Sequence, residues 1–320
     1  MLRNLRWLLV APVLVFMLLA IVFFEKDRSH EALWERFAYS DSRSVELNEM
    51  PVHYRILGQG KPLLLLHGTG ASLHTWDGWM TELQDSFQLI AVDLPAFGLT
   101  GPHPERDYSI PAYVDFVKDV VDELALDSFA LAGNSLGGLI AWAYTAKHPE
   151  KVTELVLLDA AGLPGANAAS DKPPLPMRLA QNPLTAAMLK WFTPRFIIKN
   201  SLLDVYADDT KVTDELVDRY FEMSLREGNR QAFIDRSNTS TLMDTSLLRS
   251  IYQPTLILWG AQDQWIPLSD ATRFANLLPN DTLMVLEEVG HVPMEEVPSK
   301  TAQITREWLN KNTRQHTQVD

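Results

Sequence analysis

The chain of 320 residues contains no cysteine. This absence excludes a thiol nucleophile, a thiolate metal site, an iron–sulfur cluster and any disulfide bond. It leaves the cellular compartment open, because a chain without cysteine can fold in a reducing or an oxidising environment.

Positive charge is also scarce. Lys and Arg number 28 against 41 Asp and Glu, so the formal net charge is −13 and the pI is about 5.1. Phosphate binding requires a basic surface, so nucleic acid is not an expected partner. Hydrophobic residues make up 46% of the chain and charged residues 22%, which is typical of a folded globular protein and excludes a disordered one.

A long uncharged run lies near the N-terminus, at residues 7–24. Its length of about 18 residues is near the lower limit for a helix that spans a bilayer. Arg3 and Arg6 precede it, so the positive-inside rule keeps the N-terminus in the cytoplasm. A cleaved signal peptide is the alternative, but the run is long for one and no small-x-small cleavage site follows. We therefore predict a single-pass membrane protein with residues 1–28 as anchor in the lipid bilayer, residues 29–43 as polar linker, and the rest on the extracytoplasmic, periplasmic side.

Beyond residue 43, strand-like and helix-like patterns alternate. Ser44–Met50 and Val52–Leu57 are expected to form a first pair of strands that is separated at Pro51. Continuous apolar runs such as Leu63–Leu66 predict strands that are covered on both faces. Such alternation is typical of a mostly parallel sheet with helices on both faces.

The alternation stops between Gly162 and Ile251, where six prolines and amphipathic stretches replace the strand-like runs. We interpret this segment as a helical insertion over the carboxyl edge of the sheet. The predicted organisation is an α/β core over residues 44–164 and 251–312, a helical cap over residues 165–250, and a polar tail over residues 313–320.

The sequence Gly133-Asn134-Ser135-Leu136-Gly137 lies between an apolar strand and a helix. A G-x-S-x-G pattern in that setting predicts a nucleophile elbow, a turn so tight that its flanking positions must be glycine. The helix that follows points its N-terminus at the serine and favours a developing negative charge there. We therefore predict Ser135 as nucleophile rather than as an ordinary turn residue.

A serine hydroxyl needs a general base and an acid that orients the base. His291 follows the last predicted strand and Asp263 follows the strand before it, so both lie at the edge of the sheet that carries Ser135. This chain order is typical of the fold that uses the elbow. Asp159 also ends a strand and competes for the acid role, whereas Asp93 is assigned a structural role in the loop that follows it.

An oxyanion in such a site needs two preorganised backbone N–H donors. Leu136, the residue after the nucleophile, is predicted to supply one. The loop His67-Gly68-Thr69-Gly70 is predicted to supply the other through Thr69, with His67 packing the loop. No metal or organic cofactor is expected. The cap is rich in large apolar side chains, which either bind an apolar substrate or pack the cap on the core: Met177, Leu179, Met188, Trp191, Phe192, Phe196 and Met223.

The motifs HGTG, GNSLGG, WGAQD and GH, each at a strand end, resemble the α/β-hydrolase family over roughly residues 44–310. The resemblance implies an eight-stranded sheet with the insertion as its lid. Within the family, GNSLGG, VTDELVDRY and PTLILWGAQDQWIPL are most similar to the hydrolases of meta-cleavage products, which split a carbon–carbon bond in a dienoic diketone. That similarity implies that Asn134 contacts the substrate, that Arg219 binds its carboxylate, and that Gly70 and Val292 lie in the same pocket. Val292 stands where those enzymes usually carry tryptophan.

Several functions are compatible with these residues. The leading prediction is a serine hydrolase that cleaves a carboxylic ester through an acyl-enzyme, acting on a small apolar ester or ketone. A carbon–carbon hydrolase would need Arg219 or another lid cation facing Ser135, and a haloperoxidase-like perhydrolase would share the triad. An epoxide hydrolase or dehalogenase is disfavoured because it would carry aspartate as nucleophile. A catalytically silent binding protein would be expected to have a damaged triad.

Overall fold

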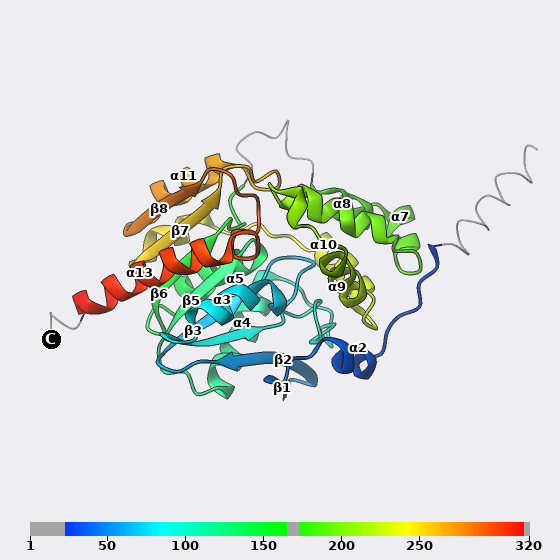
Figure 1. Cartoon of the computed structure of the whole chain (residues 1–320), viewed down its shortest axis with the longest axis horizontal. Coiled ribbons are helices and arrows are strands. Elements are labelled where there is room, and N and C mark those ends of the chain that lie inside the picture. Colours follow the sequence, from blue (N-terminus) through cyan, green and yellow to red (C-terminus); the bar gives the residue numbers. More distant parts are fainter. Residues whose placement is uncertain (1–22, 165–172, 317–320) are drawn as a thin grey trace, which may run out of the picture.

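The computed structural model describes residues 23–164 and 173–316. Its eight strands form one sheet in the order β1-β2-β4-β3-β5-β6-β7-β8 (Figure 1). From β4 to β8 along this order, neighbouring strands are parallel, whereas β1 and β2 are antiparallel additions at one edge. The strands are β1 (Ser42–Leu47), β2 (Met50–Leu57), β3 (Lys61–Leu66), β4 (Phe87–Val92), β5 (Phe129–Asn134), β6 (Val152–Leu158), β7 (Thr255–Gly260) and β8 (Asp281–Leu286).

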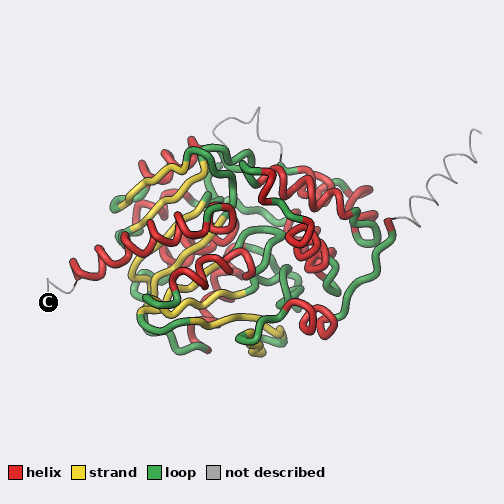
Figure 2. The backbone as a smooth tube through the Cα atoms, viewed as in Figure 1, coloured by secondary structure: helices red, strands yellow, loops and turns green. Residues whose placement is uncertain are grey.

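Helices cover both faces of the sheet, which explains the continuous apolar runs of the central strands. Figure 2 shows helices on both faces of the sheet. In β3, Leu63 and Leu65 belong to the apolar cluster that includes residues of α3 and α13, while Leu64 and Leu66 belong to the cluster that includes residues of α4, α5 and α11. Successive side chains of a strand point to opposite faces, so a strand buried on both sides has no polar positions. These helices are α3 (Asp77–Leu83), α4 (Ile110–Glu123), α5 (Leu136–Lys147), α11 (Leu268–Leu277) and α13 (Pro298–His316), preceded by the short α12 (Pro293–Glu296).

Between β6 and β7 the described residues contain helices and no strand. These helices gather at one end of the sheet and form the lid (Figure 1). Local signals start them: the side chain of Asn182 accepts the N–H groups of Leu184 and Thr185, and Pro183 occupies the first helical position of α7. The lid helices are α6 (Leu175–Gln181), α7 (Pro183–Leu189), α8 (Arg195–Val205), α9 (Asp214–Ser224) and α10 (Asn229–Asn238).

The first strand pair turns earlier than the sequence predicted. Asn48 and Glu49, both with positive φ (51° and 63°), form the turn, and Pro51 lies within β2 opposite Glu46. Two residues of positive φ match the twist of a tight hairpin, and proline is tolerated in a strand near a sheet edge.

The segment predicted as a polar linker contains a helix, α2 (His30–Phe37). The Ser29 hydroxyl caps it by accepting the Ala32 N–H at 3.2 Å. Leu33 is buried, and it packs with Met223 of the lid in a small apolar cluster. The helix therefore docks on the folded domain.

The structure corrects the prediction of a membrane location. No helix within residues 23–164 or 173–316 combines the length and the apolar character that crossing a bilayer requires. The predicted span at residues 7–24 lies outside the described residues except for Phe23 and Phe24. These two rings pack against lid aromatics, Phe23 at 6.0 Å from Phe196 and Phe24 at 6.3 Å from Trp191 between ring centroids.

Candidate active site

Ser135 occupies a sharp turn between β5 and α5. Its φ of 54° and ψ of −116° lie in a strained region that residues with a side chain rarely adopt. The flanking glycines are required by close packing, because a Cβ on Gly133 would lie 2.2 Å from the Gly137 carbonyl oxygen, and one on Gly137 would lie 2.1 Å from the Leu66 carbonyl oxygen. The turn therefore has the geometry of a nucleophile elbow, with the Ser135 side chain at the carboxyl edge of the sheet.

His291 and Asp263 come together at the same edge. His291 Nδ1 lies 2.6 Å from Asp263 Oδ2, and both side chains are almost fully buried. The other carboxyl oxygen of Asp263 accepts the N–H groups of Trp265 at 2.7 Å and Ile266 at 2.9 Å. These donors fix the carboxylate, which orients the imidazole with Nε2 directed away from the aspartate.

His291 Nε2 is buried and has no hydrogen-bond partner, so the structure does not contain the direct bond to Ser135 that the sequence predicted. Such contacts are often long without a ligand and tighten when substrate binds. Ser135, Asp263 and His291 nevertheless converge at one site, since Ser135 and His291 line the same cavity.

The loop after β3 lies against the elbow. A Cβ on Gly68 would lie 3.2 Å from Ser135 Cβ, so the backbone at Gly68, next to Thr69, passes directly beside Ser135. Leu136 is the first residue of α5, where an N–H has no acceptor within the helix. The two N–H groups predicted for the oxyanion hole, those of Thr69 and Leu136, therefore belong to backbone segments that flank Ser135.

His67 and Asp93 shape these loops. His67 is fully buried, with Nδ1 2.8 Å from the Gly68 carbonyl oxygen and Nε2 2.9 Å from the Leu94 nitrogen, so it packs the loop as expected. Burial lowers its pKa, which keeps the ring neutral. Asp93 accepts the N–H groups of Leu73 and Leu99, both at 2.7 Å, which fixes the loop after β4.

A cavity of about 150 Å³ lies between the sheet edge and the lid. Gly70, Ser135 and Val292 line it. Of the seven apolar lid residues singled out, Met177 and Met223 line it, whereas Trp191 and Phe196 are exposed. Most of the remaining lid contribution is apolar and includes Leu189, Ile197, Ile198, Leu202, Val205 and Phe233.

Asn134 lines the cavity, but its side-chain amide forms hydrogen bonds within the protein. Nδ2 donates to the His291 carbonyl oxygen at 2.9 Å and to the Leu158 carbonyl oxygen at 3.1 Å. Both amide hydrogens are thereby used within the site. Asn134 ties the histidine loop to the nucleophile strand, a role that the sequence pattern did not reveal.

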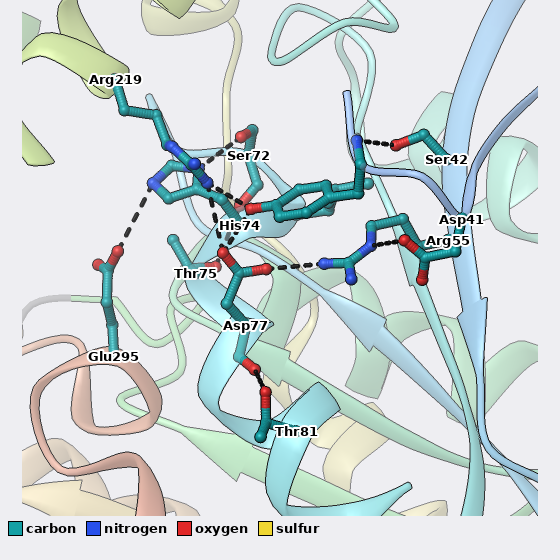
Figure 3. A network of polar contacts seen from close by, with 12 residues as sticks. Asp41, Ser42, Arg55, Ser72, His74, Thr75, Asp77, Thr81, Arg219 and Glu295 are labelled. Atoms are coloured by element: carbon teal, nitrogen blue, oxygen red, sulfur yellow. Dashed lines mark hydrogen bonds and ion pairs between the residues drawn. The ribbon is translucent and has the colours of Figure 1, made fainter. Parts of the chain in front are cut away.

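Arg219 is not part of the cavity lining, which corrects its predicted role. Its guanidinium points toward the side chain of Asp77 (Figure 3). The distance from Arg219 Nη1 to Asp77 Oδ2 is 3.3 Å, and the Tyr39 hydroxyl also contacts Nη1. Arg219 therefore fastens the lid helix α9 to the core because an acidic partner and an aromatic partner hold it there.

Glu296 was missed by sequence reasoning. Its buried carboxylate accepts the Gly290 N–H at 2.7 Å and, from the segment after α8, those of Ala207 at 3.0 Å and Asp208 at 2.9 Å. The His291 N–H also donates to the Val205 carbonyl oxygen at 2.7 Å. The histidine loop is therefore held by the lid, through a glutamate that no motif marks.

Among the described residues, metal-ligating side chains converge at Asp159, Asp263 and His291. Asp263 already accepts two backbone N–H groups and pairs with the imidazole, so its oxygens are committed within the protein. We therefore assign Asp263 and His291 to the candidate triad and not to a metal site.

Comparisons with known proteins agree with this geometry. The alpha/beta hydrolase fold family matches residues 61–298. A 2-hydroxymuconate semialdehyde hydrolase of Pseudomonas sp. strain CF600 is 29% identical over 79% of this chain and 88% of its own. The meta-cleavage product hydrolase of Pseudomonas fluorescens IP01 superposes with a TM-score of 0.73 and 25% identity over 84% and 97% of the two chains. A bacterial membrane phospholipase A gives a TM-score of 0.73 and 27% identity over 98% and 99%. The chain is therefore a hydrolase that belongs to the α/β-hydrolase fold family.

Proposed function

We propose that the protein hydrolyses a carboxylic ester with an apolar acyl group through an acyl-enzyme. The observation that supports this best is the cavity at Ser135: the lid residues that line it are mostly apolar, and Arg219, which pairs with Asp77, is not among them. A space of this size in a protein interior holds a group about as large as benzene, so a short acyl chain or an aryl group fits without lid movement.

The mechanism follows from the positions of the side chains. Asp263 accepts the Nδ1 hydrogen of His291, which leaves Nε2 to take the proton from Ser135 as its oxygen attacks the ester carbonyl. The Thr69 and Leu136 N–H groups receive the oxyanion. His291 then gives its proton to the leaving alcohol. Water, deprotonated by His291, cleaves the acyl-enzyme, releasing the acid and restoring Ser135.

A carbon–carbon hydrolase of the meta-cleavage type is the second candidate. The Pseudomonas relatives named above carry that activity in their names, and they favour this candidate over the ester reading. Arg230, on lid helix α10, also lines the cavity and could supply the cation that such a substrate needs. Its Nε and Nη2 already bind Asp27, but its buried Nη1 has no hydrogen-bond partner. The phospholipase relative supports the ester reading instead.

The test uses the full chain and compares kcat/KM for p-nitrophenyl esters of increasing acyl length with that for a dienoic diketone acid. We expect ester turnover that depends on acyl length and disappears in Ser135→Ala. Fast diketone cleavage with weak ester turnover, sensitive to Arg230→Gln, would establish the second candidate. Ester turnover that persists in Ser135→Ala would refute the nucleophile itself.

A further inference from the structure

A second carboxyl group lies beside the candidate triad. Asp159 directly follows β6, and its side chain is fully buried. Its φ of 44° places the backbone in the left-handed region, which non-glycine residues occupy only when the surroundings enforce it. One carboxyl oxygen of Asp159 lies within 4.8 Å of a carboxyl oxygen of Asp263 and of a ring nitrogen of His291. The histidine therefore has two carboxyl groups within reach.

The two carboxyl groups are stabilised very differently. Asp263 receives three donors: the N–H groups of Trp265 and Ile266 and the imidazole of His291. Asp159 receives one donor, the Gly260 N–H, which lies 3.0 Å from Oδ1. Asp159 Oδ2 is buried and has no hydrogen-bond partner. Asp263 is therefore held by three donors, whereas Asp159 is held by one.

Two ionised carboxylates at this separation in a dry site repel each other strongly, so such pairs usually share one proton. The ionisable groups that act on Asp159 are Asp263 and His291, which come from the loops after β7 and β8 and lie within 4.8 Å of it, and the charge of Glu296 on α12. Burial, with the charges of Asp263 and Glu296, raises the pKa of Asp159 well above its ordinary value. A proton on Asp159 gives the unpartnered Oδ2 a hydrogen to donate.

We propose that Asp159 is a positioning residue that shares one proton with Asp263, donating a hydrogen bond to it in the resting enzyme and replacing it as the acceptor of the His291 Nδ1 hydrogen when Asp263 cannot serve. The proposal rests on the proposed function, because it takes Ser135, His291 and Asp263 as the reacting triad. When Asp159 takes over as acceptor, its O–H bond breaks and the proton passes to water; no other covalent bond changes.

The test compares Asp263→Asn with Asp159→Asn/Asp263→Asn in the full chain, with p-nitrophenyl butyrate as substrate between pH 6 and 9.5. Replacing the triad acid by its amide ordinarily lowers kcat by about 10⁴-fold. We expect Asp263→Asn to retain about 10–100 times the kcat of the double variant, since removing the Asp263 charge lets Asp159 ionise. The kcat of Asp263→Asn should also rise with pH, and that of the double variant should not.

Equal kcat for the two variants at every pH, with both folded by circular dichroism, would overturn the proposal. A second comparison is independent of Asp263: Asp159→Val should lower kcat about 10-fold without raising KM, and Asp159→Asn, which can still donate to Asp263, should recover most of the loss. Full activity in Ser135→Ala would instead refute the proposed function. If Ser135→Ala is inactive but the Asp159 variants have the kcat of the wild type, only the role of Asp159 is refuted.

Discussion

At the scale of single residues, Asn134 offers a test that separates positioning from substrate binding. Its amide holds the His291 and Leu158 carbonyl oxygens. Asn134→Ala should destabilise the fold by about 2 kcal/mol, because two buried acceptors lose their donor. It should lower kcat about 10–100-fold with little change in KM, because His291 loses its fixed position. Denaturant unfolding and ester kinetics measure both effects. Asn134→Asp, whose side chain has the same shape but no N–H donor, should have the same effects as Asn134→Ala. A raised KM at unchanged kcat would instead show that Asn134 binds the substrate.

Two glycines of the candidate site can be compared as a matched pair of substitutions: Gly137 is closely packed, and Gly70 has a positive φ in open space. A Cβ on Gly137 meets the Leu66 carbonyl oxygen at 2.1 Å, whereas a Cβ on Gly70 meets nothing within 4 Å although φ there is +75°. We expect Gly137→Ala to prevent folding of the elbow and abolish activity. Gly70→Ala should lower the free energy of unfolding by only about 1–2 kcal/mol, because a side chain is disfavoured in the left-handed backbone conformation. Thermal unfolding of both variants checks this, and equal losses would show that the contact at Gly137 relaxes.

How much of the site the sequence predicts depends on what holds each residue. Ser135, Asp263 and His291 are identifiable because each follows a strand, and parallel strands deliver their ends to one edge. The predicted role of Arg219 was wrong because its position on a helix does not show which neighbouring residue will pair with its side chain. Glu296 leaves no pattern, since its partners are backbone N–H groups, two of which lie 88 and 89 positions away in the lid.

At the scale of elements, the lid helix α9 docks on the core through two adjacent side chains. Arg219 reaches Asp77 (Figure 3) and the Tyr39 hydroxyl. The Tyr220 hydroxyl donates to Glu295 Oε2 at 2.8 Å. The Tyr220 ring also packs edge-on against His74, 4.7 Å between centroids. Burial lowers the pKa of His74 to about 3, so the ring stays neutral in this interface.

Glu295 in this interface should make stability depend on pH. Burial raises its pKa from 4.5 to about 7. The folded protein therefore binds more protons than the unfolded chain between these values, and this contribution to stability is present below about pH 4.5 and lost as pH rises through 7. Glu295→Gln, which still accepts from Tyr220, should exceed the wild type by roughly 3 kcal/mol at pH 8 and match it near pH 4.5. Urea unfolding at both pH values measures the difference.

The neighbouring Glu296 is the matched control for that experiment. Its carboxylate accepts three backbone N–H groups, which an amide nitrogen would oppose. Glu296→Gln should therefore destabilise the protein at pH 8 by about 2 kcal/mol. A gain in stability in both variants would point to a general relief of negative charge and would contradict the specific role of Glu295.

Secondary-structure elements were predictable from the sequence where their environment is the same on both faces. The buried parallel strands follow their apolar runs because both faces are covered by helices. The hairpin turn at Asn48 and Glu49 was displaced from Pro51 because edge position makes a proline acceptable within a strand. Helix α2 was hidden in a polar segment because only Leu33 is fully buried, too little for a periodic signal.

At the scale of the whole molecule, the segment before α2 runs along the lid and connects it to the rest of the chain. The Glu25 N–H donates to the Trp191 carbonyl oxygen at 3.1 Å, and the Arg28 N–H to the Leu225 carbonyl oxygen at 2.7 Å. Arg28 also pairs with Glu222 at 3.1 Å. The lid is thus held on one side by this segment and on the other by the histidine loop, so changes at residues 24–28 should reach the catalytic cavity.

Asp27 is the residue at which to test that connection. Its carboxylate lies 2.6 Å from Arg230 Nη2, and the Arg230 side chain is 7% exposed against 43% for Asp27. Removing one partner of a buried pair leaves an unpaired charge, but exposure of Asp27 lets water compensate in part, so Asp27→Asn should cost about 1–2 kcal/mol. Because Arg230 lines the cavity, the variant should also change KM for short esters more than kcat. The control is Asp122→Asn, because Asp122 and its partner Lys118 are about half exposed. Water screens such a pair, so this variant should leave both the stability and the kinetics unchanged. Unfolding and ester assays on the two variants decide the matter: if Asp27→Asn behaves as Asp122→Asn does, the segment lies on the lid without coupling to the cavity.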